Sequence, residues 1–285
     1  PRKKTIRAIA KLGRRNIVEK GNLFLAGDIF EQGLSLSADK YPKLYAFFVY
    51  YLLTIYQHQG RYKEAEVLYE KVVLQLKNRA WLVVMLTAMI SIRLQQRRWD
   101  DVDKILAEAR ALLSSRNVTW RSIVLFNYEA RVFYERAQVD EAQRITLLKQ
   151  AKELFEKSKT MESQITPDLR VNVRNNDLGR VLIAMGSYED AARLLEDKLN
   201  RYKSENNLFG ILSVTITMAN AYRLINKFDK ASELAKDYSA AQTCAMAVGF
   251  FLICSMMFRR SSVLAISSVP TPCAKTAGVR LTAMI

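Results

Sequence analysis

Residues 175–199 read NNDLGRVLIAMGSYEDAARLLEDKL, and the spacing within this stretch decides the fold. A Leu-Gly pair stands in the first half, Gly-Ser-Tyr in the middle, and Ala and Leu recur in the second half. Positions four residues apart lie on one face of a helix, so a small side chain lets a second helix approach while a large one fills the space beside it. Glycine frees the backbone for a turn. The stretch therefore predicts two helices packed across a short turn.

The same pattern returns about every forty residues along the chain, which is the signature of a repeat protein. Five segments that combine a turn with a second helix begin at Gly21, Gly60, Arg97, Gly186 and Asn226. A sixth copy has a longer connector, 138–145, between the helical stretches 119–137 and 147–158. In the second helices a small residue precedes a large one by four positions at Ala26 and Phe30, Ala65 and Tyr69, Ala151 and Phe155, and Ala191 and Leu195.

Composition also favours helices. Only ten Gly and five Pro occur in 285 residues, which is sparse for a chain of many strands and tight turns. Half of the residues are apolar, which is enough for a sizeable core. We therefore predict an all-α fold.

The repeated residues resemble the tetratricopeptide repeat (TPR) family, whose unit pairs a Leu-Gly and a Tyr in its first helix with Gly, Tyr, Ala and an aromatic residue through its second. The residues that fit are Leu52, Tyr56, Gly60, Tyr62, Ala65 and Tyr69 in one unit and Leu178, Gly179, Gly186, Tyr188 and Ala191 in another. The resemblance covers residues 7–239. It implies a right-handed α-solenoid of about six helix-turn-helix repeats. We assign residues 1–20 to the first helix of the first repeat, 21–239 to the array, and 240–285 to an atypical tail.

A solenoid offers an extended concave surface, so we expect a scaffold or adaptor that binds a protein or peptide. The repeats run near forty residues, whereas the TPR unit has about 34. In that respect they look more like the helical sensor domains of maltose-regulator-type and peptide-pheromone-receptor transcription regulators. The alternative function is therefore ligand or peptide sensing in a regulator whose DNA-binding module lies outside this sequence, which starts at Pro1 without an initiator Met and reads as a fragment.

The sequence contains few of the residues and motifs that catalysis requires. His58 is the one histidine, which excludes a two-histidine metal site within the chain, and its place at the polar end of a helix predicts a solvated side chain. No phosphate-binding loop, dinucleotide motif or HExxH is present. We expect no enzyme activity and no cofactor. The three cysteines all lie in the last 42 residues, and no signal peptide is visible, so we expect a cytoplasmic, reducing compartment.

The net charge of +16 is concentrated at the ends: residues 1–20 carry +7 and 241–285 carry +4. Nucleic acid could therefore bind only through the basic N-terminus or a domain outside this sequence. The candidate phosphate contacts are Arg2, Lys3, Lys4, Arg14 and Arg15. The simpler interpretation is a solvated helix with Ile6, Ile9 and Ile17 packed inward.

The candidate partner site lies on the first helices of the late repeats. Asn can donate to and accept from a peptide backbone, and Arg can fork onto a carboxylate. The candidate residues at helical spacing are Asn176, Arg180, Asn220 and Arg223, with Tyr50 and Tyr128 at similar inner positions of earlier repeats. A polar helix face that merely stays hydrated is the competing interpretation.

The tail has no acidic residue from Ser239 to Ile285. Its run of fourteen apolar or small residues, 245–258, is short of the roughly twenty needed to cross a bilayer. Three interpretations stay open: a buried helix of a last repeat, membrane contact through Phe250 and Phe251, or a stretch that is not native coding sequence. The sequence thus contains no firm membrane signal and no indication of oligomeric state.

Overall fold

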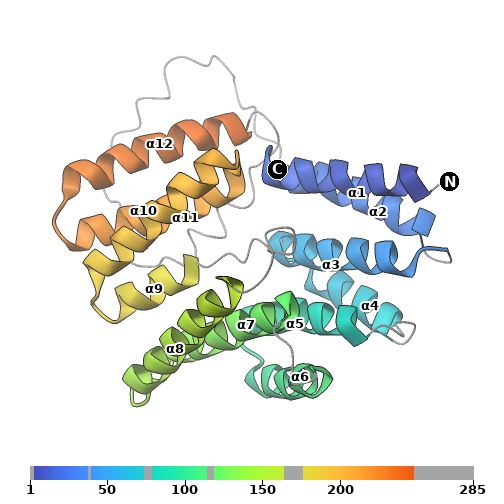
Figure 1. Cartoon of the computed structure of the whole chain (residues 1–285), viewed down its shortest axis with the longest axis horizontal. Coiled ribbons are helices and arrows are strands. Elements are labelled where there is room, and N and C mark those ends of the chain that lie inside the picture. The colour runs from blue at the N-terminus through green and yellow to red at the C-terminus, as the bar shows by residue number, and fades with distance from the viewer. Residues whose placement is uncertain (1–2, 38–39, 74–78, 114–118, 164–175, 247–285) are drawn as a thin grey trace, which may run out of the picture.

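The computed structural model describes residues 3–37, 40–73, 79–113, 119–163 and 176–246, and every element in these ranges is a helix (Figure 1). The helices are α1 (Lys3–Val18), α2 (Leu23–Ser37), α3 (Pro42–Gln59), α4 (Tyr62–Val73), α5 (Arg79–Gln95), α6 (Trp99–Leu112), α7 (Trp120–Arg136), α8 (Arg144–Ser163), α9 (Asn176–Ala184), α10 (Tyr188–Ser204), α11 (Leu208–Leu224) and α12 (Phe228–Met246). The predicted all-α fold is confirmed.

The helices form six successive pairs, each an odd-numbered helix packed on the even-numbered helix that follows it. The odd-numbered helices also contact one another from α1 through α7, and again between α9 and α11. We call them the inner helices. Between the fourth and fifth pairs the main contact is instead α8 on α9. The result is the α-solenoid expected from the repeats, built as a chain of helix pairs (Figure 1).

The turn inside a pair depends on one residue with a left-handed backbone. All five predicted turn residues have positive φ: Gly21 at 63°, Gly60 at 74°, Arg97 at 57°, Gly186 at 81° and Asn226 at 60°. Glycine adopts this conformation freely and Asn tolerates it, whereas Arg97 is strained there. The fourth pair lacks such a residue and uses a longer connection between α7 and α8. The sequence pattern therefore located these turns correctly.

The predicted small and large residues of the second helices are the contact points within the core. Ala26, Phe30, Ala191 and Leu195 are fully buried, and the other predicted pairs are buried or half-buried. Gly179 explains the Leu-Gly motif, because a Cβ at this position would stand 2.7 Å from Leu195 Cδ2. A helix can approach this closely only where the facing residue has no side chain. The Leu-Gly motif thus allows α9 and α10 to pack closely.

The array curls so that its two ends meet. α11 contacts α1, and Phe209 and Leu212 of α11 belong to the same buried cluster as the residues of α1–α5. The ring of His58 lies 5.9 Å from that of Phe209, in an edge-to-face arrangement. His58 is half-buried, so the prediction of a solvated side chain was wrong; no sequence pattern indicated that α11 would fold back onto α3.

The structure tests the assignments of the two ends of the chain, 1–20 and 240–285, only in part. Ile6 and Ile17 of α1 are buried and Ile9 is half-buried, which confirms the inward packing of the basic first helix. α12 continues to Met246, beyond Ser239. Residues 247–285, with Phe250 and Phe251, lie outside the described residues, so the interpretations of the tail stay predictions.

Two glycines of α2 offer a matched test of the close packing. A Cβ on Gly33 would overlap the buried ring of Phe48, whereas a Cβ on Gly27 would sit at an ordinary 3.6 Å from Ile55 Cγ2. We expect Gly33→Ala to lower the free energy of unfolding by about 1–2 kcal/mol, because overpacking outweighs the gain in helix propensity. Gly27→Ala should raise it by up to about 1 kcal/mol.

Urea unfolding followed by far-ultraviolet circular dichroism measures both variants. Equal effects of the two substitutions would contradict the proposed role of Gly33.

Candidate functional site

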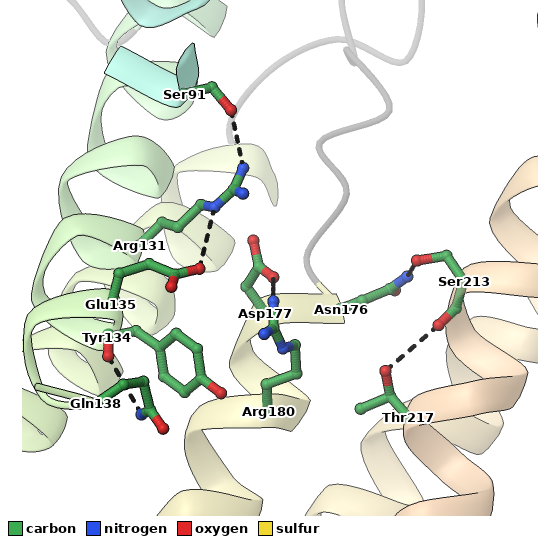
Figure 2. Close-up of polar contacts among 10 residues, drawn as sticks. All are labelled: Ser91, Arg131, Tyr134, Glu135, Gln138, Asn176, Asp177, Arg180, Ser213 and Thr217. Carbon is green, nitrogen blue, oxygen red and sulfur yellow. Dashed lines mark hydrogen bonds and ion pairs between the residues drawn. The ribbon is translucent and has the colours of Figure 1, made fainter. Parts of the chain in front are cut away.

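Polar side chains gather where the inner helices α5, α7, α9 and α11 come together (Figure 2). They come from four repeats, and several of them are buried or half-buried. We call this set the inner polar row; its members are Ser91, Arg131, Glu135, Asn176, Asp177, Arg180 and Ser213, and we add to it the predicted pair Asn220 and Arg223 farther along α11. An inner surface of this kind is the usual place where a solenoid meets a partner.

The first part of the row joins α3, α5 and α7. The buried hydroxyl of Ser91 accepts a hydrogen bond from Gln57 Nε2 at 2.6 Å and another from Arg131 Nη1 at 3.1 Å. Arg131 Nε lies 3.9 Å from Glu135 Oε1, too far for a hydrogen bond (Figure 2). Both of these buried atoms have no hydrogen-bond partner in the described part of the chain. Arg131 is thus held in place while part of its guanidinium stays unsatisfied.

The second part of the row is centred on Arg180 of α9. Its Nη1 lies 3.3 Å from Asp177 Oδ1, and its guanidinium carbon lies 4.9 Å from the centre of the Tyr134 ring (Figure 2). Burial lowers the pKa of Arg180, but the neighbouring Tyr134 and Asp177 outweigh this effect and the pKa is raised. Its side chain is 34% exposed, so the charge remains accessible.

Asn176 has a structural role that the sequence did not predict. It is only 5% exposed, and its Nδ2 donates a hydrogen bond to Ser213 Oγ at 2.8 Å, which joins α9 to α11 (Figure 2). Its Oδ1 is buried without a hydrogen-bond partner among the described residues. Replacing Asn176 therefore removes a contact between repeats as well as a candidate ligand contact.

The third part of the row lies on α11. Arg223 Nη2 donates to Asn220 Oδ1 at 3.1 Å, and both side chains are half-buried. The Nε of Arg223 is buried without a hydrogen-bond partner in the residues described. The predicted pair of α11 is thus preorganised by its own hydrogen bond.

The two predicted tyrosines, Tyr50 and Tyr128, pack against hydrophobic clusters and are not members of the inner polar row. The half-buried Tyr50 packs against the cluster of α1–α5 and stands edge-on to Tyr51, with ring centres 5.4 Å apart. Tyr128 packs against the cluster formed by α5, α6 and α7. Both rings therefore contribute to the core as well as to the surface.

Sequence reasoning missed Arg131, Glu135 and Asp177. A signal for Arg131 was present, because Asn127 precedes it by four residues just as Asn176 precedes Arg180. The two asparagines also behave alike: Asn127 Nδ2 donates to Ser158 Oγ at 2.6 Å, and its Oδ1 is buried without a partner in the described ranges. The Asn-x-x-x-Arg spacing thus marks equivalent places on α7 and α9.

The candidate phosphate contacts are arranged on the first helix. Lys3, Lys4, Arg14 and Arg15 of α1 are exposed, and Arg2 lies outside the described residues. Arg15 forms an ion pair with Glu19 at 2.6 Å, and the hydrogen bond to Glu19 raises the pKa of Arg15. The candidate phosphate contacts on α1 thus belong to a different repeat from the residues of the inner polar row.

Among the described residues, no group of three His, Cys, Asp or Glu side chains could hold a metal ion. Within the same ranges, no helix combines the length and apolar character needed to cross a membrane.

One cationic group close to the row is largely buried. Lys198 of α10 has its pKa lowered to about 8, because burial disfavours the charged form. The carboxylates of Glu162 and Asp177 oppose this shift only in part. Lys198 therefore destabilises the fold whenever it is protonated.

Comparison with known proteins places the repeat motif on the second helix pair. Residues 54–74, which span the end of α3 and all of α4, match the family model described as Tetratricopeptide repeat. No curated protein sequence matches the chain.

Among solved structures, similar chains include two crystal structures of nearly identical TPR-like repeats from a protein described as a kinesin light chain of Podosopora anserina. One of them, a form with a single substitution, is 16% identical, with a TM-score of 0.39, and the match covers 85% of this chain and 97% of that one. The other is 18% identical, with a TM-score of 0.37, covering 84% and 95% respectively.

The contact between Asn176 and Ser213 can be measured by a double-mutant cycle. We expect Asn176→Ala and Ser213→Ala each to lower the free energy of unfolding, with a coupling energy of about 1 kcal/mol, because the two side chains share one hydrogen bond. Urea unfolding of the single and double variants gives the coupling. Asn200→Ala, on the exposed face of α10, is the control and should change little. Additive effects of the two substitutions would show that the hydrogen bond contributes nothing.

The buried Lys198 makes stability depend on pH in a defined window. Its pKa is about 8 in the folded chain and near 10.5 when unfolded, so the charge opposes folding below pH 8 and the penalty disappears as pH rises to 10.5. Lys198→Met should therefore be more stable than the unmodified chain at pH 7, by roughly 2–3 kcal/mol. That advantage should shrink between pH 8 and pH 10.5. Urea unfolding across this range tests it, and an advantage independent of pH would contradict it.

Proposed function

We propose that the chain is a binding scaffold that holds an acidic peptide segment of a partner protein along its inner polar row. One observation carries the proposal: buried polar atoms on three inner helices, α7, α9 and α11, have no hydrogen-bond partner within the described residues. Within the inner polar row these atoms are Arg131 Nε, Glu135 Oε1, Asn176 Oδ1 and Arg223 Nε. Leaving such groups unpaired costs about 1–3 kcal/mol each, so folded proteins rarely keep them without a reason.

The types of unsatisfied atom fit a peptide. The unsatisfied atoms are buried, so a peptide would reach them only with a shift of the side chains around them. Its backbone offers both N–H donors and C=O acceptors, which would then satisfy an amide oxygen and a guanidinium nitrogen. An extended chain would meet groups on successive repeats, whereas a compact small molecule would meet only some of them. The spread of the unsatisfied atoms over three repeats therefore favours a segment of protein.

The charge of the row supports an acidic partner. Three arginines, Arg131, Arg180 and Arg223, stand with only two carboxylates, Glu135 and Asp177. Guanidinium groups bind carboxylates in a forked geometry, and such bonds are stronger where water is excluded. Arg180 is partly exposed and its pKa is raised, so it keeps its charge over the whole physiological range.

We further propose that binding is the whole function and that the chain is not an enzyme. The one histidine, His58, rests against Phe209 at the junction of α3 and α11, which fits a packing role. If the chain instead belongs to a transcription regulator, the same row would hold the sensed peptide, and the effect of binding would appear in a DNA-binding module outside this sequence.

Arginine substitutions on the row test the proposal. Two short labelled peptide libraries, one enriched in Asp and Glu and one in Lys and Arg, can be compared by fluorescence anisotropy. We expect only the acidic library to bind. Arg131→Gln with Arg223→Gln should weaken binding at least about tenfold, because a hydrogen bond to a charged group contributes about 1.5–3 kcal/mol.

Arg193→Gln is the matched control, because Arg193 lies on the outer helix α10 with a side chain 77% exposed. It should leave binding unchanged, and far-ultraviolet circular dichroism should show that every variant keeps its helices. Equal binding of both libraries, or full binding by the double variant, would refute the proposal.

A further inference from the structure

The first helix pair carries a second exposed surface, and it is strongly basic. Lys4, Arg7, Lys11 and Arg14 are all exposed and recur at three- or four-residue steps, so they share one face of α1. A different face of α1 is buried in the core through Ile6, Ala10 and Ile17. α1 lies at the edge of the array, as Figure 1 shows. The basic face therefore points away from the body of the protein.

The same helix pair also exposes large apolar side chains. Leu12 of α1 is 51% exposed, and Phe24 and Leu25 in the first turn of α2 are 45% and 43% exposed. Phe24 and Leu25 are adjacent in the chain and stand in the helix turn that follows the basic helix. Adjacent exposed apolar side chains, unlike the single ones on other helices, form a candidate contact surface.

The turn between α1 and α2 fixes this arrangement. Gly21 has a positive φ, its N–H donates to Ile17 O at 3.1 Å, and the N–H of Leu25 donates to Asn22 Oδ1 at 2.9 Å. The last basic residues of α1 and the apolar first turn of α2 thus lie at the same end of one rigid hairpin.

We propose that this hairpin docks the array onto a membrane surface rich in anionic lipids. The basic face of α1 would contact the lipid headgroups, and Phe24 and Leu25 would enter the interface between headgroups and acyl chains. Attachment of this kind combines electrostatic attraction with a small buried apolar area and needs no helix that spans the bilayer.

The apolar tip distinguishes this proposal from nucleic-acid binding by the same helix. Phosphate contacts would use the basic side chains alone and would gain nothing from Phe24 and Leu25. A bilayer interface accepts both kinds of side chain.

Vesicle flotation with the full chain tests the proposal, using vesicles of phosphatidylcholine alone and of phosphatidylcholine with phosphatidylserine. We expect binding only to the anionic vesicles. Lys4→Gln with Lys11→Gln and Arg14→Gln should weaken it roughly a hundredfold, since each charge near the surface contributes about fivefold. Phe24→Ser with Leu25→Ser should weaken it at least about tenfold and leave a binding more sensitive to salt.

Matched controls come from other helices. Val67→Ser on α4 and Ile145→Ser on α8 remove apolar side chains that are even more exposed, at 65% and 70%, and should leave vesicle binding unchanged. A Phe24→Trp variant should show quenching by brominated lipids only in anionic vesicles.

Three results would overturn the proposal. The first is equal binding to both kinds of vesicle, and the second is unchanged binding by both hairpin variants, which would assign attachment to another part of the chain. The third is binding of a duplex oligonucleotide that depends on the basic residues but not on Phe24 and Leu25, without binding to vesicles.

Discussion

Several neighbouring helices in this chain pack at the distance that a residue without a side chain allows. Gly13 lies under the ring of Phe30, Gly179 under Leu195 and Gly210 under Tyr202, each so close that a Cβ would collide with the facing side chain. The large residue fills the space that the glycine leaves, so burial is gained without a void. The first two contacts set the spacing within a pair, α1 on α2 and α9 on α10, and the third sets the spacing between successive pairs, α10 on α11. The positions of α9 and α11, and so of their part of the inner polar row, depend on these contacts.

The turns and the helix contacts within a pair could be predicted because each depends on residues close together in the sequence. A left-handed turn residue and a small residue four positions before a large one act within a single helix pair, and the pattern from Gly186 to Leu195 shows both. The relative placement of distant repeats could not be predicted, since it accumulates from small rotations between neighbours that no short motif encodes. This is why the packing of His58 against Phe209 and the contact of Asn176 with Ser213 appeared only in the structure.

The inner polar row was predicted only in part for a related reason. Asn176, Arg180, Asn220 and Arg223 were found from their helical spacing on two helices, which is a property of the sequence. Arg131 and Glu135 come from α7, and their relevance depends on α5 and α9 lying nearby. The Asn-x-x-x-Arg spacing shared by α7 and α9 was visible in the sequence, but its meaning required knowing that both arginines face the same interior. Electrostatic sites built across repeats are thus harder to find than the repeats themselves.

The contact of α11 with α1 changes how such an array folds. In a linear solenoid each repeat contacts only its neighbours, so the terminal repeats fray first and the unfolding transition loses cooperativity as the array grows. Here Phe209 and Leu212 pack in one cluster with residues far earlier in the chain, such as Ile17 and Leu23. Neither end can open alone without exposing part of the same core. The cost is slower folding, because closing a loop of this length must precede the contacts that stabilise it.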